Sequence, residues 1–91
     1  MRCFAVESDE RFADEKDENR RVYKALIASL DESVGRILTA LDEKGLAEDT
    51  LVVFISDNGG AEYTQAVDNA PLLGGKLTLF EGGLKVPFAL R

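Results

Sequence analysis

Apolar residues recur at spacings of three and four between about residue 19 and residue 44, which predicts one long amphipathic helix. The positions on its apolar face are Val22, Leu26, Leu30, Val34, Ile37, Leu38 and Leu41. Gly45 follows Lys44 and matches a glycine C-cap, so the helix is expected to end there. Gly35 is unusual inside a helix, and it marks either the close approach of another backbone or a tolerated surface glycine.

The next pattern is a continuous apolar run, Leu51-Val-Val-Phe-Ile-Ser56, bounded by turn-forming residues. Such a run predicts a strand buried on both faces, as in the parallel sheet of an α/β protein. With the preceding helix and a short polar connector, it forms the second half of a βαβ unit. Residues 59–75 are typical of a loop over the sheet edge. Residues 84–90 alternate like a strand, which Pro87 limits to an edge or a short extended stretch.

The composition narrows the classes of protein. The 91 residues suffice for one small domain, but most complete α/β enzymes are longer. A hydrophobic content of 45% with 31% charged residues indicates a soluble globular protein. The net charge of −6 argues against nucleic acid as a partner. No apolar stretch approaches the length of a membrane span, so no membrane partner is expected. Nothing resembles a signal peptide, and the compartment stays open.

The N-terminal residues carry much of the acidity. Residues 7–18 hold seven acidic and two basic side chains, which is typical of a solvated face or a loose acidic arm. We therefore divide the chain into an acidic arm, residues 1–18, and a globular part, residues 19–91. Cys3 is the single cysteine, and the sequence holds no histidine, so neither a disulfide within the chain nor a zinc site is expected.

Asp57 and Asn58 directly follow the predicted strand. In open α/β sheets, ligands bind just beyond the carboxyl ends of the strands. A carboxylate and an amide oxygen are hard donors that suit Ca²⁺ or Mg²⁺, but Ca²⁺ normally takes about six to eight oxygen ligands, so this pair is an incomplete site. The alternative is an Asn-Gly turn capped by the aspartate. The glycines that follow, Gly59 and Gly60, fit either a turn or a close approach to a ligand.

Lys76 follows two glycines, Gly74 and Gly75, and precedes another apolar stretch. Held there, its ammonium group would act as a point charge on the oxygens of a sulfate or phosphate ester. The alternative is an ordinary solvated lysine. Glu81 either orients Lys76 or caps a turn.

With these residues in view, the stretch from Tyr23 to Arg91 resembles the sulfatase family of the alkaline phosphatase superfamily. Four ordered blocks carry the resemblance: Tyr23 to Asp31 with Val34-Gly-Arg36, Leu51 to Gly60, Asp68 to Lys76, and Thr78 to Gly83 with Val86-Pro-Phe88. The resemblance implies a segment of a three-layer α/β/α sandwich with a mostly parallel sheet. It comprises a long helix, a buried strand, an active-site loop and a short terminal strand. Residues 19–91 would then be a partial catalytic domain.

The resemblance also implies roles for the candidate residues. Asp57 and Asn58 correspond to the second pair of calcium ligands, and Lys76 corresponds to a lysine that contacts the sulfate group of a sulfate-ester substrate. Family members use a formylglycine, made from a Cys/Ser-x-Pro-x-Arg motif, whose hydrate attacks sulfur. That motif is absent here, as are the histidines and the first aspartate pair. In the family's Arg-Gly-Gly-Lys-Gly pattern, Leu73 and Leu77 replace the outer residues.

We therefore expect a sulfuric ester hydrolase segment that is inactive by itself. Two alternatives stay open. One is a segment of a phosphodiesterase or phosphonate hydrolase of the same superfamily, and the other is a non-catalytic remnant that acts as a small binding domain. The apolar faces of the helix and of the strand would be exposed in such a segment, so self-association through them is expected.

Overall fold

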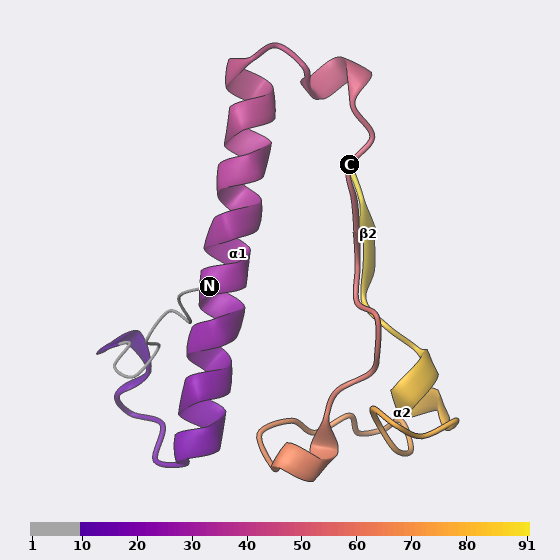
Figure 1. Ribbon diagram of the computed structural model, residues 1–91. Coiled ribbons are helices and arrows are strands. Elements are labelled where there is room, and N and C mark those ends of the chain that lie inside the picture. Colours follow the sequence, from indigo (N-terminus) through magenta and orange to yellow (C-terminus); the bar gives the residue numbers. More distant parts are fainter. Residues whose placement is uncertain (1–9) are drawn as a thin grey trace. The chain divides into compact units, whose positions relative to one another are not determined.

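A computed structural model describes residues 10–91, which form two units that meet between residues 46 and 47. The first unit contains a short 3-10 helix, η1 (Glu10–Phe12), and the long helix α1 (Glu18–Glu43), seen in Figure 1. The predicted helix is confirmed to within one residue at each end. The side chain of Asp17 caps its first turn by accepting a hydrogen bond from the backbone N–H of Arg20 at 2.9 Å.

The predicted glycine stop of α1 is also confirmed. Gly45 has φ +67°, the left-handed conformation that glycine adopts without a Cβ clash. Its N–H donates to the Asp42 carbonyl at 3.0 Å, and the N–H of Leu46 donates to the Leu41 carbonyl at 2.9 Å. These bonds satisfy two of the carbonyls that the last turn of a helix leaves unpaired.

The described part of the acidic arm is tied to α1. Arg11 forms an ion pair with Glu32 at 2.6 Å, and Lys24 forms one with Glu15 at 2.5 Å. The hydrogen bond from Lys24 is the main cause that holds the pKa of Glu15 below its usual range. Residues 10–17 are mostly exposed to solvent, and these ion pairs join them to the helix. The start of the arm, with Cys3, lies outside the described residues.

The apolar stripe of α1 has little cover within its own unit. Ala25, at 2% exposure, is the one buried hydrophobic side chain among residues 10–91, whereas Leu26, Leu30 and Ile37 are exposed. A Cβ added at Gly35 would meet no atom of this unit within 4 Å. Of the two readings of Gly35, the first unit therefore supports the surface glycine.

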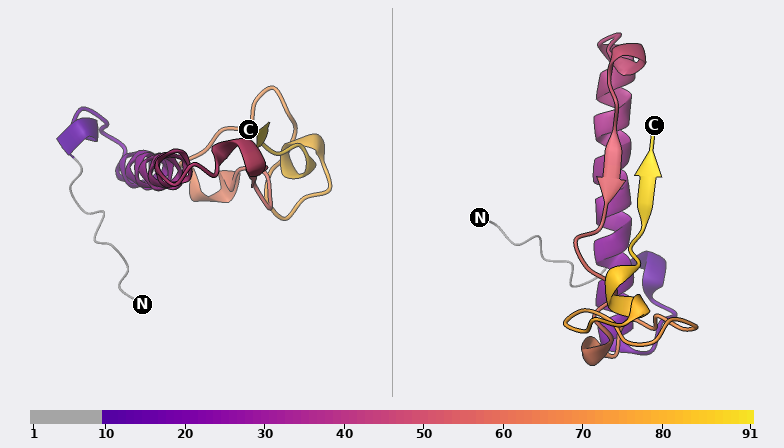
Figure 2. Two further views of the ribbon diagram at one scale, coloured as in Figure 1. Left: turned by 90° about the horizontal axis from the view of Figure 1, so that it is seen from above. Right: turned by 90° about the vertical axis from the view of Figure 1, so that its right-hand side faces the viewer.

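The second unit is built on a pair of strands. Its elements are the 3-10 helix η2 (Ala47–Asp49), strand β1 (Val53–Ile55), the 3-10 helix η3 (Glu62–Thr64), helix α2 (Glu81–Leu84) and strand β2 (Phe88–Leu90). The two strands run antiparallel, as the right-hand view of Figure 2 shows. Val53 lies opposite Leu90, Phe54 opposite Ala89, and Ile55 opposite Phe88. The long connection between them folds together with α2 at one end of the pair (Figure 1).

Two strand predictions are not confirmed within the described residues. The run 51–56 was predicted to be buried on both faces, yet Leu51 is 73% exposed and Ile55 58% exposed. The physical reason is that β1 has a single neighbour in the described chain, and no layer of this unit covers either face of the sheet. That sheet is antiparallel, so the predicted parallel sheet is not seen in residues 10–91. β2 does start directly after Pro87, as expected for a short edge strand.

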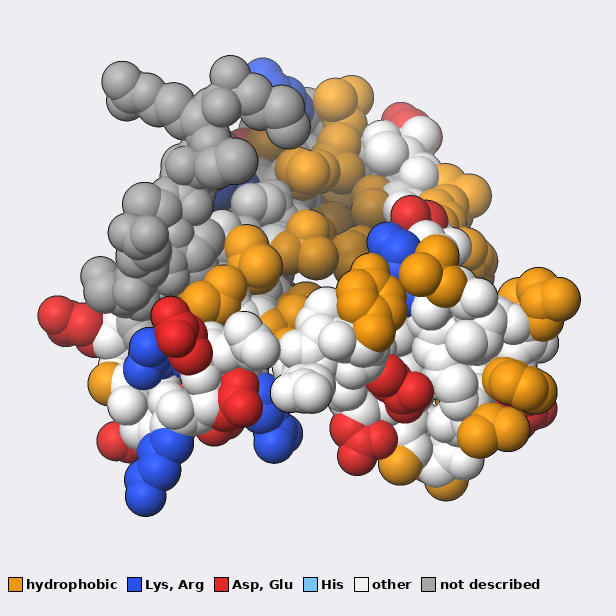
Figure 3. Space-filling view, turned by 60° about the horizontal axis from the view of Figure 1, so that its bottom comes forward, with side chains coloured by type: hydrophobic (Ala, Val, Ile, Leu, Met, Phe, Trp, Pro, Cys, Tyr) orange, Lys and Arg blue, Asp and Glu red, His pale blue; other side chains and the backbone are white. Residues whose placement is uncertain are grey.

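Hydrophobic side chains reach the surface of the protein among polar ones (Figure 3). In the connection between the strands, the large exposed ones are Leu73, Leu77, Leu79, Phe80 and Leu84. Such apolar surface is typical of a region that packs against further protein. Within residues 10–91, none of the helices combines the length and the apolar character that crossing a membrane requires.

Candidate functional site

The first part of the site is the strand end, residues 56–60. Ser56 stabilises the turn there, because its hydroxyl donates a hydrogen bond of 2.8 Å to the Asn58 carbonyl. Asp57 is exposed and Asn58 half-buried. A hydrogen bond from the Asn58 side chain is the main cause that lowers the pKa of Asp57, and the positive charge of Lys76 acts in the same direction. Asp57 is therefore ionised at neutral pH.

The second part is the lysine loop, residues 69–78, whose backbone crosses the strand end. The backbone N–H of Lys76 donates to the carbonyl of Gly60 at 2.9 Å. Gly60 is two residues after Asn58, so this bond holds the backbone of Lys76 next to the strand end. The effect of its charge on the pKa of Asp57 agrees with this placement. The structure thus brings together the three residues predicted from the sequence, Asp57, Asn58 and Lys76. They lie in one unit and on two segments.

Glycines make this crossing possible. A Cβ at Gly75 would overlap the Gly60 carbonyl oxygen, and one at Gly82 would overlap the Gly74 carbonyl oxygen. At Gly59 a Cβ would overlap the Gly82 carbonyl oxygen. At Gly60 a Cβ would overlap the side chains of Asn69 and Val67. Both glycines after Asn58 therefore allow other parts of the protein to approach closely, and a close approach to a ligand stays a prediction.

Asn69 is a residue that the sequence reasoning did not single out. Its side-chain nitrogen Nδ2 donates two hydrogen bonds of 3.0 Å, one to the Gly60 carbonyl and one to the Gly74 carbonyl. Its backbone N–H donates to the Glu62 carboxylate at 3.2 Å. Asn69 joins the strand end to the lysine loop. Its place in the block that ends at Lys76 was the one signal available in the sequence.

Leu77 occupies an unusual conformation for its type. Its φ is +76°, in the region that favours glycine, and its side chain is 85% exposed. The turn around it is closed by the N–H of Thr78, which donates to the Gly75 carbonyl at 3.0 Å. The backbone therefore requires a left-handed residue where the family pattern has glycine, and here a leucine adopts it.

Glu81 takes neither of the two roles considered for it. It lies in the first turn of α2 and pairs with Lys85 at 2.9 Å, one helical turn away. The residue at the start of α2, Phe80, makes no side-chain cap. Glu81 is a surface ion-pair partner, and the backbone N–H of Lys76 donates to the Gly60 carbonyl.

The strand end fits part of a calcium site. Asp57 offers an ionised carboxylate, and the side-chain amide of Asn58 carries an oxygen of the kind that binds a hard cation. Within residues 10–91, no three acidic or thiol side chains gather closely enough to hold a metal. Ca²⁺ takes about six to eight oxygens, and these two side chains could offer at most a minority of them.

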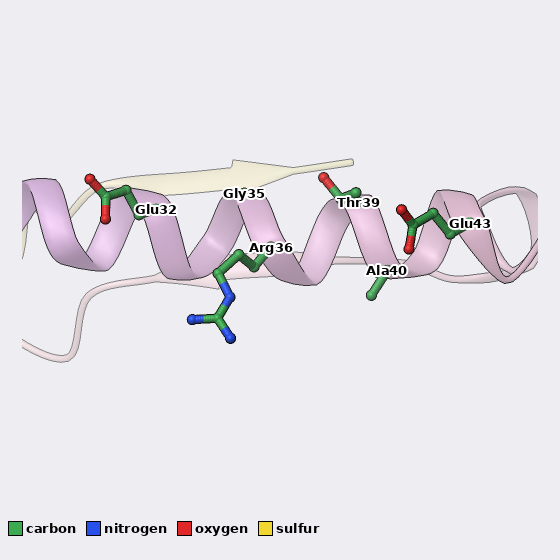
Figure 4. A pocket seen from close by; sticks show the side chains of 6 residues that line it. All are labelled: Glu32, Gly35, Arg36, Thr39, Ala40 and Glu43. Carbon is green, nitrogen blue, oxygen red and sulfur yellow. The ribbon is translucent and has the colours of Figure 1, made fainter.

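A hollow on α1 is not a second site. It is lined by Glu32, Gly35, Arg36, Thr39, Ala40 and Glu43. Figure 4 shows Arg36 and Ala40 pointing to one side of the helix and Glu32 and Thr39 to the other. Side chains that diverge from one helix do not converge on a ligand, so this hollow is a feature of the helix surface.

Comparison with known proteins places these observations in a family. The family model described as Sulfatase matches residues 4–91. A protein named Sulfatase from Formosa agariphila is 40% identical over 77 residues, which cover 76% of this chain and 14% of that protein. N-acetylgalactosamine-6-sulfatase of Mus musculus is 41% identical over 68 residues, covering 71% of this chain and 13% of its own length.

A solved structure is similar as well. The crystal structure of Ps i-CgsB in complex with k-i-k-neocarrahexaose matches with a TM-score of 0.83 and 31% sequence identity, covering 96% of this chain and 20% of that chain. The mixed helix and strand fold of this chain thus matches part of a sulfatase-like fold. The chain belongs to the sulfatase family of hydrolases. It spans about one seventh of the length of the curated relatives described above.

Proposed function

We propose that this chain carries part of a sulfatase active site, in which Asp57 and Asn58 bind Ca²⁺ and Lys76 contacts the sulfate group of an ester substrate. The observation that supports this most strongly is the hydrogen bond between the Lys76 N–H and the Gly60 carbonyl, which holds a cationic residue beside an acidic strand end. A cation site and an anion contact side by side suit an ester with a charged leaving oxygen. Family membership supplies the substrate class.

Each residue has a distinct task in this proposal. Asp57 presents a carboxylate whose pKa is lowered, so it is ionised at neutral pH. Asn58 offers its amide oxygen as a second donor beside that carboxylate. Bound Ca²⁺ would supply charge neutralisation at the sulfate oxygens. Lys76 adds a compact positive charge next to them, which stabilises the negative charge that develops as the ester bond breaks.

The chain alone is proposed to be inactive. It holds no Cys/Ser-x-Pro-x-Arg motif and no histidine, so no nucleophile of the family's type is encoded. We also propose that the exposed faces of β1 and of α1 are covered in a three-layer α/β/α domain with a mostly parallel sheet. The half-exposed apolar stripe and the sheet without a covering layer support that arrangement.

A calcium titration of the isotopically labelled chain tests the metal assignment. Backbone shifts should change at Asp57, Asn58 and Gly59, with a dissociation constant of about 1 mM or weaker because few ligands are present. Asp57→Ala should abolish the response. Asp49→Ala removes another exposed acid of the same unit and serves as the matched control. A response that survives Asp57→Ala, or one that Asp49→Ala abolishes equally, would contradict the assignment.

An assay on an aryl sulfate, with Ca²⁺ present, tests the proposed inactivity. No turnover above the buffer rate is expected. Turnover that Asp57→Ala removes would show that the chain is a complete catalyst, contrary to the proposal.

A further inference from the structure

Among residues 10–91, Asn69 is the side chain that forms hydrogen bonds to both segments of the proposed site. Its Nδ2 reaches the Gly60 carbonyl at the strand end and the Gly74 carbonyl in the lysine loop, each at 3.0 Å. An amide nitrogen carries two donor hydrogens, so these two bonds use its full donor capacity. Asn69 is half-buried, where an unpaired amide would be costly.

The Gly60 carbonyl is the shared point of this arrangement. It accepts from Asn69 Nδ2 at 3.0 Å, from the backbone N–H of Lys76 at 2.9 Å and from the backbone N–H of Glu62 at 3.1 Å. A carbonyl oxygen has two lone pairs, so these three donors share its full acceptor capacity. The same oxygen therefore fixes the loop through a side chain on one side and through the lysine backbone on the other.

Asn69 is itself held in place. Its backbone N–H donates to the Glu62 carboxylate at 3.2 Å, and Glu62 begins η3, just after the strand end. On its C-terminal side, the turn is set by Asp68, whose carboxylate accepts from the Ala70 N–H at 2.8 Å. The backbone of Asn69 is thus fixed by these two hydrogen bonds, and a side chain on a fixed backbone can hold other groups at a fixed separation.

We propose that Asn69 is a positioning residue of the site, which sets the separation between Lys76 and the Asp57–Asn58 pair by clamping the lysine loop to the strand end. The inference rests on the proposed function, because it assigns Asn69 to the same cation and sulfate site. It differs from a purely structural role in one respect. Removal of the amide should move Lys76 away from a bound cation while the pairing of β1 and β2 persists.

Paramagnetic Mn²⁺ is the probe, since it prefers carboxylate and carbonyl oxygens as Ca²⁺ does and broadens nearby amide signals steeply with decreasing distance. In the unaltered labelled chain, Mn²⁺ should broaden the amides of Asp57 and Asn58 and that of Lys76. In Asn69→Ala, the broadening at Asn58 should persist and that at Lys76 should fall several-fold. Asn69→Asp, with the same shape but no donor at neutral pH, should behave in the same way.

Asp68→Ala is the matched control, because it changes the neighbouring residue and leaves the amide clamp in place. Its Lys76 broadening should stay close to that of the unaltered chain. The amides of Val52 and Arg91, which bond to each other's carbonyls at 2.9 and 3.1 Å, report on strand pairing.

The possible failures are distinct. If the broadening of the Lys76 amide is the same in both Asn69 variants as in the unaltered chain, and that of Asn58 persists, the positioning role is overturned and the metal assignment stands. If both variants lose the paired signals of Val52 and Arg91, Asn69 is a structural residue and the inference is overturned. If Mn²⁺ leaves Asp57 and Asn58 of the unaltered chain unbroadened, the proposed function fails, and the inference fails with it.

Discussion

Replacing Leu77 by glycine is expected to stabilise the lysine loop. A non-glycine residue in the left-handed region costs roughly 1–2 kcal/mol, and Leu77 has φ +76°. Glycine removes that cost but adds about 0.5–1 kcal/mol because it is more flexible in the unfolded chain. Since the leucine side chain is 85% exposed, its loss gives up little buried surface. The net gain is therefore about 0.5–1 kcal/mol.

Amide hydrogen exchange measures this gain locally, whether or not the whole chain unfolds in one step. The amides to follow are those of Lys76, Thr78 and Gly82, which donate to backbone carbonyls at 2.9, 3.0 and 2.8 Å. Where exchange proceeds through opening of the loop, their rates should fall roughly 2- to 5-fold in Leu77→Gly.

Two control variants separate conformational strain from loss of the side chain. Leu77→Ala shortens the side chain but keeps a Cβ in the left-handed region, so it should bring no protection. Leu79 is 89% exposed and does not have a positive φ. Leu79→Gly therefore relieves no strain and only adds flexibility, so the amides of the lysine loop should exchange faster. Slower exchange in Leu77→Ala equal to that in Leu77→Gly would refute the reasoning, because strain would then not be the cause.

Further predictions concern both units. Gly82→Ala places a Cβ against a backbone carbonyl, so the amide of residue 82 should lose its protection from exchange. Gly35→Ala meets no other atom and should stabilise α1 by about 1 kcal/mol, measured as higher helicity in circular dichroism. Equal effects of the two substitutions would contradict the packing described. The pKa of Glu15 is lowered in the folded chain, so its contact with Lys24 should be complete above about pH 4.3 and be lost as the pH falls through the lower folded value. The NMR shifts of Lys24 should change over the same pH range, and Glu15→Gln should remove this pH dependence. Self-association in sedimentation velocity should weaken in Ile55→Lys, since that side chain is exposed on β1; unchanged association would exclude this strand as the contact.

Local patterns predicted the helix well, because its determinants lie within its own sequence. The stripe of apolar residues and the glycine stop at Gly45 define α1 without help from distant contacts. Burial of the run 51–56 is not confirmed, because it depends on more than the local sequence. Whether a strand is covered on both faces depends on layers that pack on it, and the unit that contains β1 supplies one neighbouring strand and leaves β1 exposed.

In the candidate site, too, some residues could be predicted from the sequence and others could not. Asp57, Asn58 and Lys76 stand out because charged or amide side chains beside glycines form a recognisable order along the chain. Asn69 does not stand out, since an asparagine in a polar loop is ordinary and its two carbonyl partners lie nine and five residues away. The left-handed backbone of Leu77 is hidden too, because it follows from the turn closed between Gly75 and Thr78.

A chimeric enzyme tests the central claim most directly. In the Formosa agariphila sulfatase, the segment that this chain matches would be replaced by the corresponding residues of this chain, and hydrolysis of a sulfate ester would be measured with Ca²⁺ present. The account predicts an active chimera whose rate falls about 100-fold or more in Asp57→Ala and in Lys76→Ala. Lys85→Ala, a lysine paired with Glu81 at the surface, should leave the rate unchanged. A chimera whose activity survives both Asp57→Ala and Lys76→Ala would contradict the claim that these residues form part of a sulfatase site.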